Sequence, residues 1–462
     1  MTKWDRTFAC GSILSEFDRI TFVFNSAGQG ALWIIMDKVC IRGGVPLNGT
    51  VQVGGAKNAC MAMMAAALLT DEVCILRNVP QLRDVFAFIR LLQTLGVEVE
   101  ALEPHVWRLQ AKSVTHEAPY ELVRKMRASV CVLGALAGRL HKASVPLPGG
   151  CVIGNRPIDL HLYGLQKLGY AVSLKAGVVQ VKAKQPKGGR VFLGGRFGST
   201  VTGTVNVLTA AVLTPGVTVI ESAACEPEIV DLCRLLQQMG ASIDGIGSPT
   251  LKIIGTDRLH GFDYTVIGDR IEAGTFVLAG LVTRGQVRVC GAQPQHLSAL
   301  LHTLERIGAE VCVDEANQTI EVLPCLERLK PFEVATLPFP GFPTDLQAQL
   351  CVLGICIRGL SLITERIYPQ RFIHLAELQR LGAHVTLEGS TAILKGGYPL
   401  SGADVMTSDL RAGAALYLAG LVAQGETHIH RIYHVDRGYE NLDQKLRDLG
   451  ADVERTEDAD AV

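Results

Sequence analysis

The stretch LQQMGASI at residues 236–243 is one of six copies of a phrase that decides the fold. In each copy a helix-forming stretch ends on a glycine, and a short strand-like segment follows directly. Glycine readily adopts the positive φ needed at the C′ position of a helix, so each copy predicts a helix end followed by a strand. The other copies are LQTLGVEV (92–99), LQKLGYAV (165–172), LERIGAEV (304–311), LQRLGAHV (378–385) and LRDLGADV (446–453).

These copies recur about every seventy residues, a period that indicates stacked structural units. Each unit also contains a segment that is apolar nearly all round, and a helix of that kind must be buried. We therefore predict an α/β fold of six repeats, each with a buried helix, a strand, an amphipathic helix and a strand, the sheets wrapping the buried helices. The apolar segments are KNACMAMMAAALL, RASVCVLGALAG, GTVNVLTAAVL, AGTFVLAGLV, LQAQLCVLGICI and RAGAALYLAGLV.

The amino-acid composition limits the classes of protein to which this chain can belong. With 462 residues, 48% of them hydrophobic and 19% charged, the chain should fold around more than one core. The net charge of −1 provides no field for nucleic acid or an anionic membrane, so an anionic ligand needs a local cluster of bases. Thirteen cysteines without a CxxC pair or zinc-type spacing favour a reducing cytoplasm and mostly buried thiols.

Residues 1–35 are predicted to be an N-terminal extension outside the fold. Their apolar run, ITFVF at 20–24, is too short for the hydrophobic region of a signal peptide. Later apolar runs are interrupted before the ~18 residues that a membrane-spanning helix needs. Strand-like alternation begins at Met36.

Several predicted helices begin with a base or acid after a Gly- or Pro-rich entry, where free N–H groups favour anions. GGAKNA places Lys57 and Asn58 in this position, although Gly54 and Gly55 are equally expected in an ordinary tight turn. No GxxxxGK[ST] loop supports nucleotide triphosphate hydrolysis.

The C-terminal half repeats charged helix entries in FPTDLQAQ, YPQRFIH, TSDLRAGAA and HVDRGYE. Asp345 and Asp409 could each be ordinary first-turn acids, with Thr344 and Ser408 as N-caps. The coincidence across units predicts instead a multiply anionic small ligand, bound in a cleft between lobes. The bases at these entries are Lys57, Arg127, Arg156, Arg371, Arg411 and Arg437.

One cysteine stands apart from the others. Cys151 lies in PLPGGCVIGNRPIDLH (146–161), a Pro- and Gly-rich loop just before Arg156 and the helix-starting Pro157. A loop thiol near a guanidinium and a helix N-terminus is favoured as a thiolate and as an acid/base group. A reactive and an unreactive Cys151 are about equally supported by this pattern alone.

Over residues 36–457 the chain resembles the UDP-N-acetylglucosamine 1-carboxyvinyltransferase family of enolpyruvyl transferases. The resemblance implies a two-lobed inside-out α/β barrel with three repeats per lobe. The first lobe would comprise 36–56 plus 268–462, and the second lobe 57–267. It also implies the first committed step of peptidoglycan biosynthesis, in which phosphoenolpyruvate donates its enolpyruvyl group to the 3′-hydroxyl of UDP-N-acetylglucosamine. The matching motifs are GGAKNA, MRAS, LPGGC, RPIDLH, EPEIVD, FPTDLQAQ, TSDLRA and RIYHVDRGYE.

The resemblance also implies roles for single residues. Cys151 would protonate the methylene carbon of phosphoenolpyruvate and be the thiol that fosfomycin alkylates, Asp345 would be the base, and Asp409 would assist proton transfer. The phosphate of phosphoenolpyruvate would be bound by Lys57, Arg156 and Arg437, and its carboxylate by Arg371 and Arg411. Lys57 and Arg437 would also belong to the catalytic residues. Lining the substrate sites would be Asn58, Arg127, Pro157, Ile158, Asp159, Leu160, Thr200, Val201, Thr202 and Ile367.

The resemblance implies that the partners are the two small-molecule substrates. It implies no metal, organic cofactor, nucleic acid, membrane insertion or obligate protein partner.

One run departs from the family pattern. GSTVT at 198–202 stands where many relatives have Lys-x-Ser-Val-Gly, so that Gly198 replaces the lysine; Arg196 could substitute for it. One alternative is the related 3-phosphoshikimate enolpyruvyl transferase, which lacks the cysteine loop. Another is a non-catalytic UDP-sugar-binding regulator, disfavoured because the whole site is kept.

Overall fold

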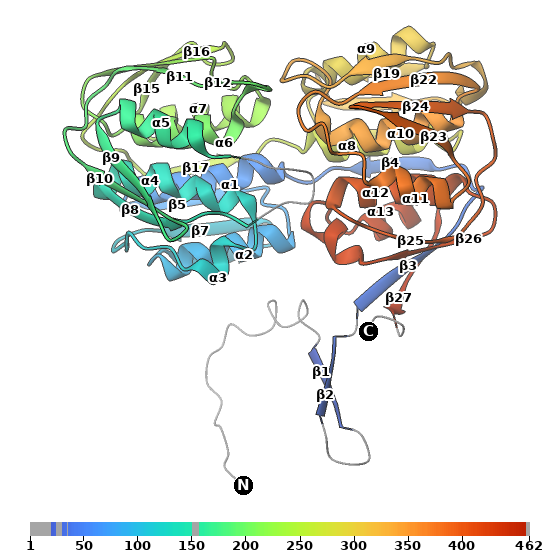
Figure 1. Cartoon of the computed structure of the whole chain (residues 1–462), viewed down its shortest axis with the longest axis horizontal. Helices are drawn as coiled ribbons and strands as arrows, with labels where there is room; N and C mark the ends of the chain where they lie inside the picture. Colours follow the sequence, from blue (N-terminus) through green and yellow to red (C-terminus); the bar gives the residue numbers. More distant parts are fainter. Residues whose placement is uncertain (1–19, 25–29, 35, 150–156, 459–462) are drawn as a thin grey trace.

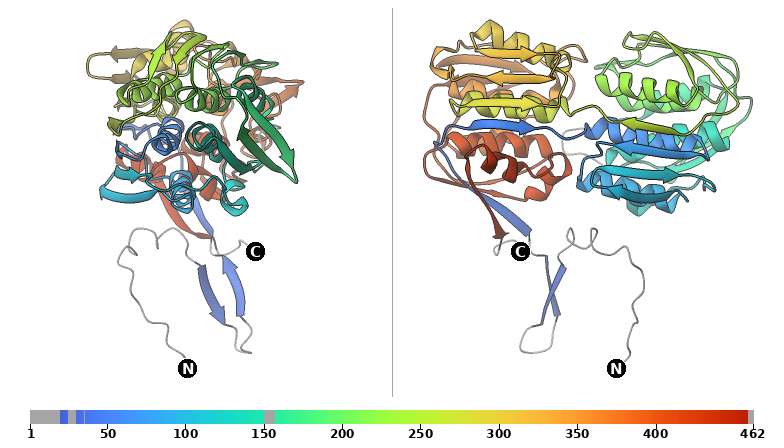
Figure 2. Two further views of the ribbon diagram at one scale, coloured as in Figure 1. Left: turned by 90° about the vertical axis from the view of Figure 1, so that its left-hand side faces the viewer. Right: turned by 180° about the vertical axis from the view of Figure 1, so that it is seen from behind.

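The computed structural model describes residues 20–24, 30–34, 36–149 and 157–458. Two lobes lie side by side (Figures 1 and 2). Core residues of the first lobe come from 39–53 and 271–453, whereas those of the second lobe come from 56–266. The chain therefore starts in the first lobe, forms the second, and returns to complete the first.

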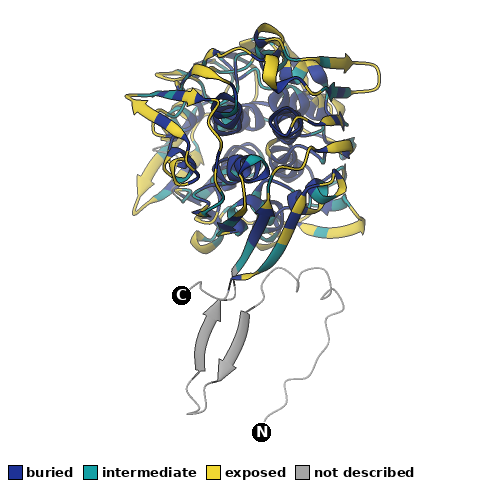
Figure 3. Ribbon diagram, turned by 90° about the vertical axis from the view of Figure 1, so that its right-hand side faces the viewer, coloured by how far each residue is buried: buried dark blue, intermediate teal, exposed yellow. Residues whose placement is uncertain are grey.

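Among the described residues, three buried helices lie inside each lobe. Figure 3 shows buried helices inside the molecule and more exposed strands around them. Small residues in these helices allow close approach: a Cβ at Gly134 of α4 would lie 2.1 Å from the carbonyl oxygen of Asn206 in α6. Each of the predicted apolar segments forms one of these helices. They are α1 (Lys57–Ala66), α4 (Val132–Leu140), α6 (Val201–Ala211), α8 (Arg270–Val282), α10 (Gln347–Cys356) and α12 (Leu410–Val422).

The second helix of each unit ends at the predicted glycine. Gly96, Gly169, Gly240, Gly308, Gly382 and Gly450 all have positive φ, and a strand follows each of them. The predicted helix ends are thus confirmed. These helices are α2 (Arg83–Thr94), α5 (Asp159–Lys167), α7 (Pro227–Gln238), α9 (Ser298–Ile307), α11 (His374–Arg380) and α13 (Leu442–Asp448); a short helix, α3 (Tyr120–Val123), precedes α4.

Each unit contributes a sheet to the outside of its lobe. The prediction of one strand after the amphipathic helix was incomplete, because this strand turns back into an antiparallel hairpin. In the second lobe, one sheet has the strand order β17 (Phe262–Thr265), β5 (Val73–Arg77), β7 (Val106–Gln110), β6 (Glu98–Glu103). A second has the order β8 (Lys142–Pro146), β10 (Val178–Ala183), β9 (Tyr170–Lys175). The third has the order β11 (Arg190–Phe192), β14 (Val217–Glu221), β16 (Thr250–Ile254), β15 (Ser242–Asp244).

The first-lobe sheets bring both ends of the fold together, because β3 and β27 are neighbours in one of them. In this sheet the last strand of the unit pairs with β3 instead of with a strand beside it in sequence. One sheet has the strand order β19 (Val311–Asp314), β20 (Thr319–Val322), β18 (Gln286–Cys290), β4 (Asn48–Gln52). A second has the order β21 (Glu333–Ala335), β22 (Gly359–Thr364), β24 (Thr391–Gly396), β23 (His384–Glu388). The sheet that joins the two ends has the order β25 (Asp404–Met406), β26 (Glu426–His430), β3 (Met36–Arg42), β27 (Asp452–Asp458).

The chain crosses between the lobes twice, and the two crossings are hydrogen-bonded to each other. The backbone N–H of Ala56 donates to Ile267 at 2.7 Å, and that of Asp269 donates to Gly54 at 2.9 Å. A Cβ at Gly55 would lie 1.8 Å from the carbonyl oxygen of Asn78, so chain packing requires this glycine. Helices α1 and α8 start directly after the crossings, which places their N-termini next to each other between the lobes.

The strands nearest the N-terminus, β1 (Ile20–Phe24) and β2 (Gly30–Ile34), pair with each other in a separate two-stranded sheet. This hairpin lies apart from both lobes (Figure 2). No helix in the described ranges combines the length and apolar character needed to cross a membrane.

Candidate active site

A buried carboxylate joins cations from the two lobes. The ammonium of Lys57, at the start of α1, lies 2.6 Å from the Oδ2 atom of Asp84 in the first turn of α2. From the first lobe, the Nε atom of Arg437 donates to the Oδ1 atom of Asp84 at 2.8 Å. Arg437 ends a short 3-10 helix, Ile432–Arg437, which follows β26. Two cations thus share one carboxylate across the lobe boundary.

Electrostatics at this group favour an additional anion. Burial lowers the pKa of Lys57, and the charges of Arg437 and Arg411 lower it further, against the attraction of Asp84. Burial also disfavours the charged form of Asp84, but the ion pairs with Lys57 and Arg437 outweigh it and lower the pKa of this carboxyl. The positive charge of the group therefore exceeds its negative charge.

A second group forms around Asp345 in the first lobe. Arg371 donates from Nη1 to the Oδ1 atom of Asp345 at 2.6 Å, and Arg411 donates from Nη2 to Oδ2 at 3.3 Å. Both arginines are buried. Burial works against the charge of Arg371, but Asp345 and Asp409 raise its pKa. Arg411 also lowers the pKa of Lys57, so the two groups act on each other electrostatically.

Two nitrogen atoms of Arg411 do not take part in its pairing with Asp345. Its Nε and Nη1 atoms are buried and have no hydrogen-bond partner among the described residues. Its guanidinium lies 5.1 Å from the centre of the Tyr439 ring. Unpaired buried donors are costly, so these N–H groups are suited to a ligand that brings its own acceptors.

Helix capping differs from the sequence prediction at two positions. The prediction of Ser408 as the N-cap of α12 was wrong: the cap is Asp409, whose extended backbone lets its carboxylate accept from the N–H groups of Arg411 at 2.9 Å and Ala412 at 3.1 Å. Thr344 does not cap either; it begins the 3-10 helix Thr344–Leu346, and its hydroxyl donates to Glu365 at 2.9 Å. Asp409 therefore has a structural function, and its part in proton transfer stays a prediction.

A further group of predicted residues lies in the second lobe. Arg127 donates from Nη2 to the carbonyl oxygen of Pro157 at 3.5 Å, just before α5. Ile158 is buried, Leu160 is half-buried, and Asp159 is exposed. Beside Lys57, the side chain of Asn58 is exposed. Cys151 and Arg156 lie outside the described residues.

The run that departs from the family pattern begins with strand β13 (Gly198–Ser199), which pairs with β12 (Gly194–Gly195). Thr200 caps α6 by accepting from the N–H of Gly203 at 3.2 Å, and half-buried Val201 follows it. Thr202 contacts the Nε2 atom of His161 at 3.3 Å. Gly198 has a φ of 102°, and a Cβ there would lie 2.4 Å from Pro338 of the first lobe. The positive φ and the close contact between lobes therefore disfavour a side chain at this position in this arrangement of the lobes.

Comparison with known proteins identifies the family of this chain. Residues 41–459 match the family model described as EPSP synthase (3-phosphoshikimate 1-carboxyvinyltransferase). The chain is 47% identical to the UDP-N-acetylglucosamine 1-carboxyvinyltransferase of Methylacidiphilum infernorum (isolate V4), over 91% of this chain and 99% of the relative. The corresponding protein of Koribacter versatilis (strain Ellin345) is 49% identical over 91% and 96%. This chain belongs to the UDP-N-acetylglucosamine 1-carboxyvinyltransferase family.

Solved structures show the same fold. The enolpyruvyl transferase NikO from Streptomyces tendae superposes with a TM-score of 0.83 at 25% identity, over 92% of this chain and all of that one. An EPSP synthase from Acinetobacter baumannii gives a TM-score of 0.67 at 15% identity over 91% of this chain, which supports the fold alone. The predicted enolpyruvyl transferase fold and the family resemblance are confirmed.

Sequence reasoning missed two acids in this member of the UDP-N-acetylglucosamine 1-carboxyvinyltransferase family. Asp84 looks like an ordinary first-turn acid of an amphipathic helix, and nothing local signals its pairing with Lys57 and Arg437. Glu365 lies at the end of β22 and is fully buried. Its carboxylate receives the N–H of Ile367 at 2.8 Å, so it holds one of the predicted substrate-binding residues.

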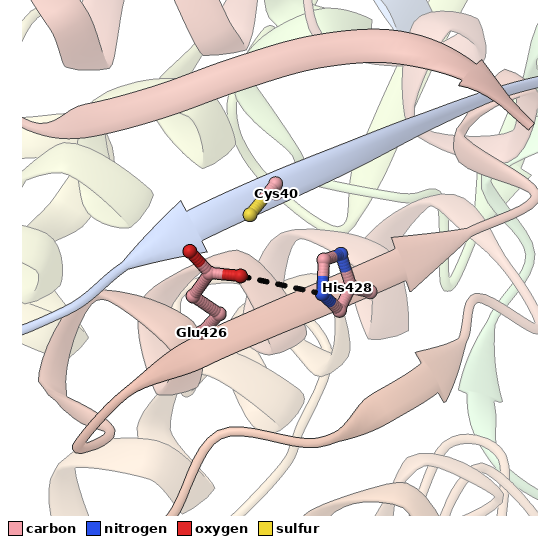
Figure 4. A group of neighbouring side chains, drawn as sticks. All are labelled: Cys40, Glu426 and His428. Atoms are coloured by element: carbon pink, nitrogen blue, oxygen red, sulfur yellow. Dashed lines mark ion pairs between the residues drawn. The ribbon is translucent and has the colours of Figure 1, made fainter.

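One group within the described residues has the composition of a metal site. The donor atoms of Cys40, Glu426 and His428 lie within 4.8 Å of one another on β3 and β26 (Figure 4). However, the carboxylate of Glu426 already pairs with Arg42 at 2.8 Å. Burial raises the pKa of the Cys40 thiol, and the charge of Glu426 raises it further, which favours the protonated thiol. We assign this group to the surface ion pairs of the sheet and not to a metal centre.

Proposed function

We propose that this protein transfers the enolpyruvyl group of phosphoenolpyruvate to the 3′-hydroxyl of UDP-N-acetylglucosamine and releases phosphate. The observation that carries the proposal is the near-full-length identity of 47% and 49% to relatives named for that reaction. This would be the first committed step of peptidoglycan biosynthesis, in the cytoplasm. The reaction needs only the two small-molecule substrates, without a metal, an organic cofactor or a protein partner.

The buried charges support binding of phosphoenolpyruvate. Lys57 and Arg437 would turn from their shared partner Asp84 toward the phosphate, together with Arg156. Arg371 and the unpaired N–H groups of Arg411 would bind the carboxylate. Charge-assisted hydrogen bonds of this kind are stronger than neutral ones and hold the ligand in a fixed orientation.

The chemical steps need an acid and a base on opposite sides of the substrate. Cys151 would give its proton to the methylene carbon, which builds positive charge at C2 of phosphoenolpyruvate. The 3′-oxygen of the sugar would then attack C2 while Asp345, assisted by Asp409, takes the hydroxyl proton. The resulting tetrahedral ketal loses a proton from the new methyl group and expels phosphate, which restores the enol double bond.

The sugar nucleotide would bind mainly to the second lobe. Its site would be formed by residues at the starts of α1, α5 and α6 and of the 3-10 helix before α4, with one contribution from the first lobe. These are Asn58, Arg127, Pro157, Ile158, Asp159, Leu160, Thr200, Val201, Thr202 and Ile367.

Phosphate release from phosphoenolpyruvate tests the proposal. We expect release with UDP-N-acetylglucosamine but not with 3-phosphoshikimate, and we expect it to be abolished by fosfomycin and by Cys151→Ala. Release only with 3-phosphoshikimate would establish the alternative that the description of the matching family model suggests. Binding of UDP-N-acetylglucosamine without any release would indicate a regulatory protein.

A further inference from the structure

The carboxylate of Glu365 collects four hydrogen bonds in the interior of the first lobe. Its Oε1 atom accepts from the Thr336 hydroxyl at 2.6 Å and from the N–H groups of Ile367 at 2.8 Å and Tyr368 at 2.9 Å. Its Oε2 atom accepts from the Thr344 hydroxyl at 2.9 Å. In the described parts of the chain, no lysine or arginine forms an ion pair with it. A buried carboxylate is costly unless such donors satisfy it, so its position is well determined.

These contacts fix the direction of the Thr344 hydroxyl. A carboxylate only accepts hydrogen bonds, so the single proton of Thr344 must point toward Glu365. The lone pairs of the hydroxyl oxygen then face Arg371, whose Nη1 atom donates to it at 3.1 Å. The same Nη1 atom donates to Asp345 at 2.6 Å. The result is a directed chain of hydrogen bonds that ends on Asp345.

Glu365 also fixes the backbone that carries Arg371. The N–H groups of Ile367 and Tyr368 hold the turn after β22 against the carboxylate. The N–H of Arg371 then donates to the carbonyl oxygen of Tyr368 at 2.8 Å, and the guanidinium lies 6.0 Å from the centre of the Tyr368 ring. Both ends of Arg371 therefore depend on Glu365.

We propose that Glu365 is a positioning residue for enolpyruvyl transfer, which acts through Thr344 and Arg371 to orient the carboxylate of Asp345. This proposal rests on the proposed function, in which Asp345 accepts the proton of the sugar hydroxyl. Glu365 itself does not touch the substrate. Its contribution is to keep Asp345 from rotating between its two guanidinium partners.

The test compares variants that change one step of the chain. Glu365→Gln keeps the shape and an oxygen for the two N–H groups, but its amide donates to Thr344 and reverses the direction of the hydroxyl. Thr344→Val removes the hydroxyl, whereas Thr344→Ser restores it. Thr336→Val is the control, because its hydroxyl contacts Glu365 and the backbone N–H of Arg366 at 2.9 Å but neither Thr344 nor the Arg371 side chain.

We expect Glu365→Gln and Thr344→Val each to lower kcat about 10- to 100-fold, since small misplacements of reacting groups have effects of this size. The KM for UDP-N-acetylglucosamine should stay near that of the parent. Both variants should remain folded at the assay temperature, although the disturbed buried hydrogen bond lowers the thermal unfolding midpoint. Thr344→Ser and Thr336→Val should keep most of the parent kcat. The double variant should be no slower than the slower single one, because both break the same chain.

Parent-like kcat in Glu365→Gln and Thr344→Val would overturn the proposal. Equal losses in Thr336→Val and Thr344→Val would also overturn it, since Glu365 would then have only a structural role. Absence of transfer by the parent chain in the same assay would instead refute the proposed function, which separates the two failures.

Discussion

Two regions of the molecule, the space between the lobes and the outer sheet of the first lobe, use the same residue types in opposite proportions. Between the lobes, Asp84 and Asp345 are each paired with two cations, and those cations are largely buried. On the outer sheet, Arg42 serves two carboxylates, Glu426 at 2.8 Å and Asp452 at 3.4 Å, and all three are about half exposed. The surface group is screened by water and contributes little to stability.

The difference indicates what the buried group is for. Placing charges in the interior costs more than it gains unless each is well paired, so buried cations that share one carboxylate are a poor means of stabilising a fold. It is a good means of binding an anion, because the ligand provides the missing negative charge. The following changes test this contrast between the site and the surface sheet.

The largest effect is expected for Asp345→Asn. Loss of the base should lower kcat about 10²- to 10⁴-fold, the usual contribution of general acid–base catalysis. Phosphoenolpyruvate should bind at least as tightly as to the parent, because Arg371 and Arg411 lose their competing carboxylate. Steady-state kinetics and titration calorimetry measure the two quantities; a kcat close to that of the parent would exclude Asp345 as the base.

Asp84→Asn should destabilise the ligand-free protein by roughly 3–5 kcal/mol, because it leaves buried cations without a charged partner. Inorganic phosphate should restore more stability to the variant than to the parent. The pKa of Asp84 is lowered in the folded state. Its stabilisation is therefore present above the unfolded pKa of ~3.9 and is lost as the pH falls further.

Denaturant unfolding at neutral pH and near pH 3 measures this difference between parent and variant. A difference that is as large at low pH as at neutral pH would contradict the ion-pair explanation.

Arg411→Met should weaken phosphoenolpyruvate binding by about 10- to 100-fold, the value of one or two charge-assisted hydrogen bonds at roughly 1.5–3 kcal/mol. Affinity for UDP-N-acetylglucosamine should stay within twofold, because its site is proposed to lie mainly in the second lobe. Calorimetric titration with each ligand separates these effects. Equal weakening for both ligands would indicate general damage to the site.

Arg42→Met is expected to have the smallest effect. The side chain is half exposed and distant from the proposed chemistry, so the thermal unfolding midpoint and kcat should match those of the parent. A loss of phosphoenolpyruvate affinity comparable to that of Arg411→Met would remove the contrast between the two regions.

Features that repeat along the chain could be predicted from the sequence. The glycine helix ends and the buried helices follow from local spacing and composition, and they recur six times. The hairpin after each amphipathic helix was missed because its second strand has no comparable common phrase. The bases Lys57, Arg371, Arg411 and Arg437 were found because the sequence pattern predicts a helix entry at each of them, although Arg437 ends a 3-10 helix in the structure.

What the sequence could not provide depends on partners that are distant along the chain. Asp84 matters because Arg437 crosses from the other lobe, and Gly198 because Pro338 of the other lobe lies against it. Glu365 matters because the hydroxyls of Thr336 and Thr344, which are 29 and 21 residues away, meet at its carboxylate. Such contacts follow from tertiary packing, so no local pattern could reveal them.

The most direct test of the central claim follows labelled carbon from phosphoenolpyruvate into the sugar nucleotide. With ¹³C-labelled donor and UDP-N-acetylglucosamine, the parent chain should give one labelled enolpyruvyl group on the 3′-oxygen for each phosphate released. NMR and mass spectrometry would identify this product. Phosphate released without labelled sugar nucleotide, or label found only on another acceptor, would contradict the account.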